Sequence, residues 1–127
     1  MRRVYAFLMA LALVGGCGGG DSTLEDSIVG TWKTPAHVWV EYRDDGSYDV
    51  GHSRSQADLE WGSWSVDGDV LTQLTDADSN ACAGVPGVYL IEMSDDGDRF
   101  VATVQDDTCN ARIEDFTTLT RMPDSDS

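Results

Sequence analysis

Short stretches rich in β-branched and aromatic residues recur along this chain at intervals of about ten residues. Eight stretches are present, at approximately 27–33, 37–43, 47–52, 58–66, 69–75, 87–93, 99–105 and 112–122. In the second stretch Val38, Val40 and Tyr42 occupy alternate positions, as in a strand that buries one face. No stretch shows a convincing helical period. The pattern therefore predicts an all-β domain built from eight short strands.

Three of the connections carry hairpin signals of the Asp-Gly kind, at Asp45-Gly46, Asp67-Gly68 and Asp96-Gly97. Antiparallel strands joined in order can form a sandwich or an up-and-down barrel, and a closed barrel leaves no exposed sheet edge. We expect the barrel. The Asp-Gly turns then lie at one end, and the connections at 34–36, 53–57, 76–86 and 106–111 form the mouth at the other end.

The first residues are typical of an export signal. Arg2 and Arg3 precede an apolar run at 4–14, and its 11 residues are too few for a transmembrane helix, which needs about 20. The sequence LVGGC at 13–17 resembles the lipobox of bacterial lipoproteins. This resemblance implies a signal peptide at 1–16, a lipidated Cys17 as the mature N-terminus, and a flexible leash at 17–26. Because Gly18 and not Asp follows the cysteine, it also implies the outer membrane if the host is Gram-negative.

The chain is strongly acidic. It has 127 residues, enough for one domain, with 23 acidic and eight basic side chains and a formal net charge of −15. Removal of the signal peptide takes away two of the eight basic residues, so that six remain against 23 acidic ones and the charge becomes −17. Nucleic-acid binding is excluded because it needs a basic surface. The 41% content of hydrophobic residues nevertheless predicts a folded domain at 27–122, followed by a frayed tail at 123–127.

Two cysteines remain once Cys17 carries a lipid. Cys82 and Cys109 both fall in predicted mouth loops of an exported chain, so we predict a structural disulfide between them. No paired-cysteine motif accompanies them, and His37 and His52 are the only histidines in the sequence. We therefore predict neither a metal site nor a catalytic thiol.

Four segments together carry a family resemblance. IVGTWKT at 28–34, YRDDGSY at 42–48, WGSWSVDGDVL at 61–71 and the late Arg121 are similar to a bacterial lipocalin-like domain. The resemblance covers roughly 27–122 and implies an eight-stranded antiparallel barrel. It also implies a structural role for Gly30 and Trp32, on the first strand, which would pack beneath Arg121.

The aromatic residues are the candidates for a ligand pocket, because a barrel of eight strands leaves room for side chains or for one small molecule. A core that these rings fill completely is the other interpretation. The pocket candidates are Trp39, Tyr42, Tyr48, Trp61, Trp64 and Tyr89.

Other candidate chemistry is weaker. Asp76, Asp78 and Asn80 match the start of a calcium-binding loop, but Ala81 stands where the sharp-turn glycine belongs, so we predict no metal site. His37 and His52 could form a pH-sensitive or metal-binding pair at the mouth. No catalytic trio and no phosphate-binding loop is visible, so we predict neither an enzyme nor a cofactor.

Two functions remain. The first is a lipid-anchored, non-catalytic module in the cell envelope that binds a small apolar or amphiphilic ligand. The second is an acidic interaction or inhibitor protein that captures basic proteins, because a charge of −17 would steer such partners electrostatically. A cavity would favour the first function, and a clustered acidic face beside a protruding loop would favour the second.

Overall fold

The computed structural model describes residues 23–53 and 56–123. The predicted signal peptide, the predicted lipidation site Cys17, the first part of the predicted leash and the last four residues of the predicted tail lie outside the described residues.

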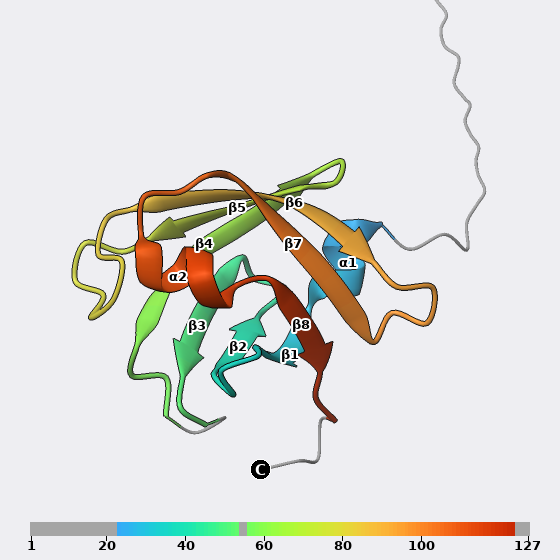
Figure 1. The fold of residues 1–127 in the computed structure, drawn as a ribbon, viewed down its shortest axis with the longest axis horizontal. Helices are drawn as coiled ribbons and strands as arrows, with labels where there is room; N and C mark the ends of the chain where they lie inside the picture. The colour runs from blue at the N-terminus through green and yellow to red at the C-terminus, as the bar shows by residue number, and fades with distance from the viewer. Residues whose placement is uncertain (1–22, 54–55, 124–127) are drawn as a thin grey trace, which may run out of the picture.

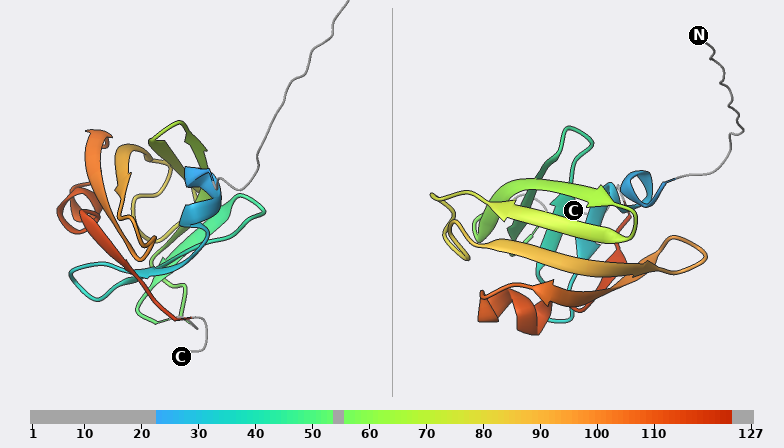
Figure 2. Two further views of the ribbon diagram at one scale, coloured as in Figure 1. Left: turned by 90° about the vertical axis from the view of Figure 1, so that its right-hand side faces the viewer. Right: turned by 90° about the horizontal axis from the view of Figure 1, so that it is seen from above.

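Within the described ranges, eight antiparallel strands form a closed barrel in which each strand pairs with its sequence neighbours (Figures 1 and 2). Trp32 of the first strand pairs with Arg121 of the last and closes the ring. The predicted all-β, up-and-down barrel is thereby confirmed. The strands are β1 (Gly30–Lys33), β2 (Trp39–Tyr42), β3 (Ser47–Gly51), β4 (Glu60–Asp67), β5 (Val70–Thr75), β6 (Pro86–Met93), β7 (Arg99–Asp106) and β8 (Thr118–Arg121).

Two short helices correct the sequence prediction, which expected none. Helix α1 (Leu24–Ile28) occupies the end of the predicted leash and the start of the first predicted strand, and α2 (Asn110–Asp115) occupies the start of the last one. Helices of five and six residues are too short for a helical period to be visible in the sequence. A local signal was present at α1, where the Thr23 side chain accepts a hydrogen bond from the Asp26 amide at 3.2 Å.

The two helices lie at opposite ends of the barrel (Figure 1). The end with α1 also holds the Asp-Gly turns, whose glycines Gly46, Gly68 and Gly97 all have positive φ, as tight turns of this kind require. We call this the closed end. The end with α2 carries the longer loops and is called the open end.

Trp32 and Arg121 seal the closed end. The guanidinium of Arg121 lies 4.2 Å from the centre of the Trp32 ring. It donates hydrogen bonds to the carbonyls of Ser27 at 2.5 Å, Val29 at 3.1 Å and Gly97 at 3.0 Å. Gly30 has a φ of +134°, and a Cβ built there would lie 2.7 Å from Nη1 of Arg121. A glycine at this position therefore lets the guanidinium approach the backbone.

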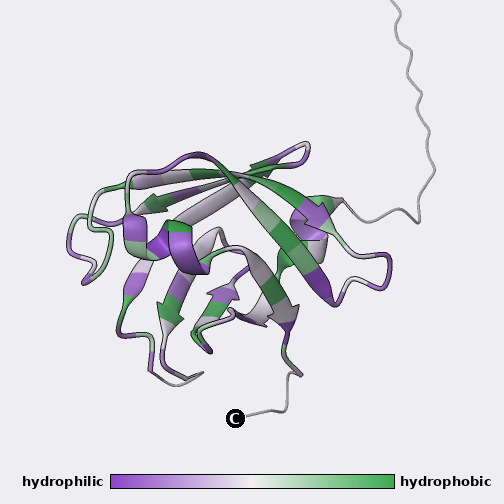
Figure 3. Ribbon diagram, viewed as in Figure 1, coloured by the Kyte–Doolittle hydropathy of each residue, from purple (hydrophilic) through white to green (hydrophobic). Residues whose placement is uncertain are grey.

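Aromatic side chains fill the closed half of the barrel. Trp32 meets Phe100 edge to face at 4.7 Å between ring centres, and Tyr42 meets Trp64 at 5.4 Å. The alternation predicted on the second strand is present at Val40 and Tyr42, which are buried, whereas Val38 lies just before β2 and is half-buried. Hydrophobic and hydrophilic residues alternate along the strands, and the turns are mainly hydrophilic (Figure 3). The packing in this half leaves the open end as the place for a binding site.

Candidate functional site

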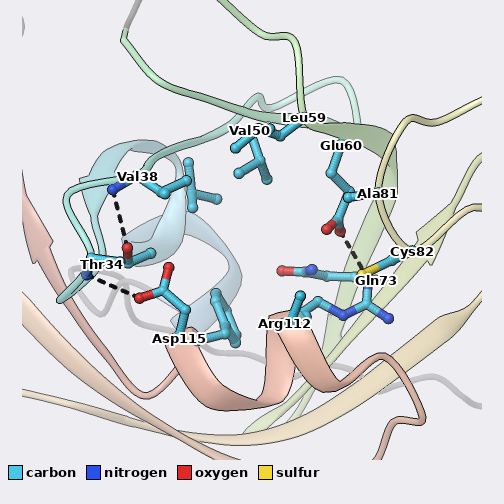
Figure 4. Close-up of a pocket in the computed structure, with 14 residues that line it drawn as sticks. Thr34, Val38, Val50, Leu59, Glu60, Gln73, Ala81, Cys82, Arg112 and Asp115 are labelled. Carbon is cyan, nitrogen blue, oxygen red and sulfur yellow. Dashed lines mark hydrogen bonds and ion pairs between the residues drawn. The ribbon is translucent and has the colours of Figure 1, made fainter.

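A cavity of about 320 Å³ lies at the open end of the barrel (Figure 4). Aliphatic side chains from β2, β3 and the adjoining loops form one part of its wall, and α2 forms another. Glu60, Gln73 and Arg112 lie close together on one side, and Thr34 and Asp115 lie on the opposite side. The lining residues are Thr34, Ala36, Val38, Val40, Val50, Leu59, Glu60, Gln73, Ala81, Cys82, Ala111, Arg112, Asp115 and Phe116.

None of the six aromatic residues proposed for a pocket lines this cavity. Tyr42, Tyr48, Trp64 and Tyr89 are buried in the aromatic core. Trp39 and Trp61 are half-buried, because they occupy strand positions next to the inward-facing Val40 and Glu60. The indole of Trp61 donates to the Asp78 carboxylate at 2.9 Å, and Lys33 lies 5.2 Å from the centre of the Trp39 ring. The wall of the pocket is therefore mainly aliphatic and polar. The prediction of an aromatic pocket was wrong because four of the six side chains pack in the core and the other two occupy outward-facing strand positions.

The polar residues of the cavity were not among the sequence candidates. Glu60 lies four positions before the buried Trp64, and Gln73 lies between the buried Leu71 and Thr75. Their places on the inward face could be inferred from strand alternation, since positions two and four apart share a face. Arg112 could not be found in this way, because it belongs to a helix that the sequence pattern did not reveal.

Arg112 is buried between two carboxylates. Its Nε donates to Asp107 Oδ2 at 2.6 Å and its Nη2 to Asp107 Oδ1 at 3.0 Å, which forms a bidentate pair. Its Nη1 donates to Glu60 Oε2 at 2.8 Å and to Thr75 Oγ1 at 2.7 Å, and Nη2 also reaches the Val85 carbonyl at 2.9 Å. Every nitrogen of the guanidinium therefore has a protein partner, and α2 is joined to β4, to β5 and to the loop that precedes β6.

The electrostatic environment favours the ionised forms of Arg112 and Asp107. Burial by itself would raise the pKa of Asp107, but hydrogen bonds from Arg112, Tyr89 and the Cys109 amide outweigh it and lower that pKa. Burial likewise opposes the charged form of Arg112, yet its hydrogen bonds to Asp107 and the charge of Glu60 raise its pKa. The side chains of Arg112 and Asp107 are 4% and 0% exposed, so water screens this ion pair very little.

Tyrosine hydroxyls complete the network. Tyr48 donates to Glu60 Oε2 at 2.5 Å, Tyr89 donates to Asp107, and Tyr42 donates to Oε1 of Gln73. Burial raises the pKa of all three hydroxyls above the usual tyrosine value. They therefore remain protonated and act as donors.

Two buried polar atoms at the cavity are unpartnered. Among the residues that the structure describes, none forms a hydrogen bond with Oε1 of Glu60 or with Nε2 of Gln73. Glu60 is 5% exposed and Gln73 is 1% exposed, so their side chains have almost no contact with bulk water. Buried polar groups normally have a partner, and leaving one without a partner costs about 1–3 kcal/mol.

The predicted disulfide between Cys82 and Cys109 is confirmed, with 5.6 Å between the two Cα atoms. Cys109 directly precedes α2, and Cys82 lies in the loop between β5 and β6. Cys82 and Arg112 both line the cavity. The disulfide thus joins two walls of the candidate site.

The histidines and the calcium-like loop are used in other ways. His52 lies 3.3 Å from the Asp58 carboxylate, and His37 borders a second, outer hollow beside β8. Asn80 donates to the Asp58 carbonyl at 2.8 Å. Within residues 23–53 and 56–123, no three His, Cys, Asp or Glu side chains are grouped in a way that could hold a metal ion.

The described helices are all too short and too polar to cross a membrane. No family model, curated protein or solved structure matches the chain significantly. The fold and the site together define the class of protein described here, which is a closed antiparallel barrel with a small cavity at one end.

Proposed function

We propose that this protein is a lipid-anchored, non-catalytic binding module whose barrel holds a small apolar or amphiphilic molecule. The cavity is the observation that carries the proposal. Its volume of about 320 Å³ is at the lower end of the range of about 300–1,000 Å³ that is typical of ligand pockets. Its wall is mainly aliphatic and holds a few convergent polar groups, the composition expected of such a pocket.

The polar network supports a binding role over a catalytic one. Arg112 binds both Asp107 and Glu60, and the three side chains together bind three tyrosine or threonine hydroxyls, so they stabilise the wall of the cavity. A wall held in this way keeps its shape before a ligand enters, which lowers the free-energy cost of binding.

The proposed anchor is the lipid on Cys17. The described chain begins beside α1 at the closed end, opposite the cavity (Figures 1 and 2). A membrane anchor attached before α1 would thus leave the open end facing away from the lipid surface. By the lipobox resemblance, the outer membrane is the proposed location in a Gram-negative host.

Native mass spectrometry of the protein, purified as the cell processes it and incubated with an extract of its own envelope, tests this function. We expect a small adduct that survives high salt. Val50→Trp should abolish the adduct because Val50 lines the cavity, whereas the exposed Val101→Trp on β7 should retain it.

Two results would contradict the proposal. One is an adduct that is equally abundant on the Val50→Trp variant, provided that this variant remains folded by circular dichroism. The other is the absence of a small adduct together with a bound basic protein that high salt releases, which would favour an acidic capture protein instead.

A further inference from the structure

The cavity carries excess negative charge. Two carboxylates, Glu60 and Asp115, line it, and a third, Asp107, binds Arg112 from outside the lining. Arg112 is the only cationic side chain among the described residues that line the cavity. With all four groups ionised, three carboxylates against one guanidinium give a formal charge of −2. Charges in a buried site cost free energy unless opposite charges or hydrogen bonds compensate them.

Glu60 and Asp107 share Arg112 unequally. Asp107 binds two of its nitrogens, Nε and Nη2, whereas Glu60 binds only Nη1 and uses its Oε2 atom for this. The Tyr48 hydroxyl donates to that same Oε2 atom. The other oxygen, Oε1, is therefore an acceptor with partial negative charge that no described residue satisfies.

Gln73 offers a second contact point. Its Oε1 accepts from Tyr42, so the orientation of the amide is defined and Nε2 is left as a donor without a described partner. Glu60 and Gln73 lie on the same side of the cavity and both point into it (Figure 4). A ligand that satisfies both would present a hydrogen-bond donor to the carboxylate and an oxygen atom to the amide.

The aliphatic side chains of the cavity favour a ligand with a small apolar part. Val38, Val40, Val50, Leu59 and Phe116 also line the cavity. Thr34 and Asp115 lie opposite Glu60 (Figure 4), where they accept hydrogen bonds from the Val38 and Ala36 amides. Together with the volume of about 320 Å³, this wall suits a short alkyl chain or a single aromatic ring, because burial of such groups is favourable and volume limits their size.

We infer that the cavity binds a small organic ammonium, with its apolar body against the aliphatic wall and its N–H donating to Oε1 of Glu60. A hydroxyl or ether oxygen beside the ammonium would accept from Nε2 of Gln73. A carboxylate-headed amphiphile is disfavoured, because its charge would lie beside that of Glu60. This inference rests on the proposed function, since it names the chemical class of the bound molecule.

Titration calorimetry with three probes of similar size tests the inference: 2-phenylethylammonium, 2-phenylethanol and 3-phenylpropanoate. About 0.5 M sodium chloride suppresses general attraction of cations to the acidic surface, because a buried pair is screened much less than an exposed one. We expect the ammonium to bind at least about tenfold more tightly than the alcohol, since a hydrogen bond to a charged group is worth that difference. We expect no measurable binding of the propanoate.

Two variants separate the site from the surface charge. Glu60→Gln should weaken ammonium binding by at least about tenfold and change alcohol binding by less than about threefold. Glu114→Gln makes the same charge change at an exposed position of α2 that does not line the cavity, and should leave both affinities unchanged.

The unsubstituted protein gives an independent readout if Glu60→Gln fails to fold. The chain has three glutamines, Gln56, Gln73 and Gln105. In ¹⁵N-labelled protein, the ammonium probe should shift the side-chain amide signals of Gln73, while those of the exposed Gln105 stay in place.

The outcomes distinguish the inference from the proposed function. Alcohol or propanoate binding that is as tight as ammonium binding, or an equal loss in Glu114→Gln, would overturn the ammonium class and leave the binding module standing. Failure of all three probes while the envelope adduct is still present would do the same. Failure of all three probes and no envelope adduct would overturn both.

Discussion

Two arginines organise the two ends of this barrel through opposite kinds of contact. Arg121 at the closed end binds three backbone carbonyls and covers the Trp32 ring, and the carboxylate nearest to it, Asp98 at 4.0 Å, is exposed to water. Arg112 at the open end meets two carboxylates in a buried site. An exposed ion pair contributes little to stability, whereas loss of a buried one is costly, so the acid sensitivity of the fold should come mainly from the open end.

The Asp107 side chain provides a direct test. Its pKa is lowered in the folded protein, so its ion pair stabilises the fold above the unfolded pKa of about 3.9 and is lost as pH falls through the folded value. Asp107→Asn should lower the free energy of unfolding by about 3 kcal/mol at neutral pH, because it leaves Arg112 short of a partner. The deficit should shrink as pH falls below about 4.

Denaturant unfolding of both proteins between neutral and acidic pH measures this difference. The control is Asp67→Asn at the exposed end of β4, which should change the stability by less than about 0.5 kcal/mol at every pH. A deficit for Asp107→Asn that stayed constant down to acidic pH would show that the ionised pair is not its cause.

At the level of elements, α2 is the part that completes the cavity. It supplies Ala111, Arg112 and Asp115 to the wall, and it is held by the ion pair with Asp107 and by the disulfide at Cys109. The hydrogen bond from the Ala36 amide to Asp115 at 3.0 Å joins it to the loop between β1 and β2. A six-residue helix has little stability of its own, so these attachments determine whether it forms.

Reduction of the disulfide should therefore affect both stability and binding. With a sequence separation of 27 residues, its loss should lower the free energy of unfolding by about 3–4 kcal/mol on the chain-entropy model. Ligand retention should fall as well, because α2 and the Cys82 loop would no longer be joined. Thermal unfolding and adduct detection with and without reductant measure the two effects.

The double variant Cys82→Ser/Cys109→Ser is the control for this experiment. It should match the reduced protein and should not respond to reductant. An unfolding temperature that reductant left unchanged in the unsubstituted protein would mean that the disulfide contributes little to the fold.

At the scale of the whole molecule, the barrel separates two tasks along its axis. The closed half contains the aromatic core, the Asp-Gly turns and α1, and the open half contains the cavity, α2 and the disulfide. If Cys17 carries the lipid, the entry of the chain at the closed end directs the cavity away from the membrane.

Cleavage by a protease specific for Asp tests this orientation. Both ends present exposed targets, at Asp67 and Asp96 on the closed end and at Asp76 and Asp106 on the open end. Attachment to vesicles should slow cleavage at the closed end more than at the open end, because the lipid surface blocks access. Mass spectrometry of the fragments gives the ratio.

Each site is compared with the same site in Cys17→Ser protein, which cannot be lipidated at that position. Equal protection of both ends, or greater protection of the open end, would contradict the proposed orientation.

Local patterns in the sequence determined the barrel, its tight turns and its disulfide. Alternating apolar positions such as Val40 and Tyr42, Asp-Gly turns such as Asp67-Gly68, and the pair of cysteines that remain apart from Cys17 were enough to predict eight strands, their order and the disulfide. Strands and turns depend on residues that are neighbours in the sequence, and the disulfide depends on one pair of cysteines. Such features can therefore be predicted without knowledge of the tertiary structure.

Only the tertiary structure decided where the cavity lies and what it contains. Glu60, Gln73 and Arg112 come from β4, β5 and α2, and they meet because the closed barrel brings inward positions from distant segments to one end. Four of the six aromatic residues that the sequence suggested for a pocket pack against other rings in the core instead, because large apolar rings gain most from mutual burial; they are Tyr42, Tyr48, Trp64 and Tyr89. The space that they leave at the open end depends on the packing of the whole ring of strands, which no single segment encodes.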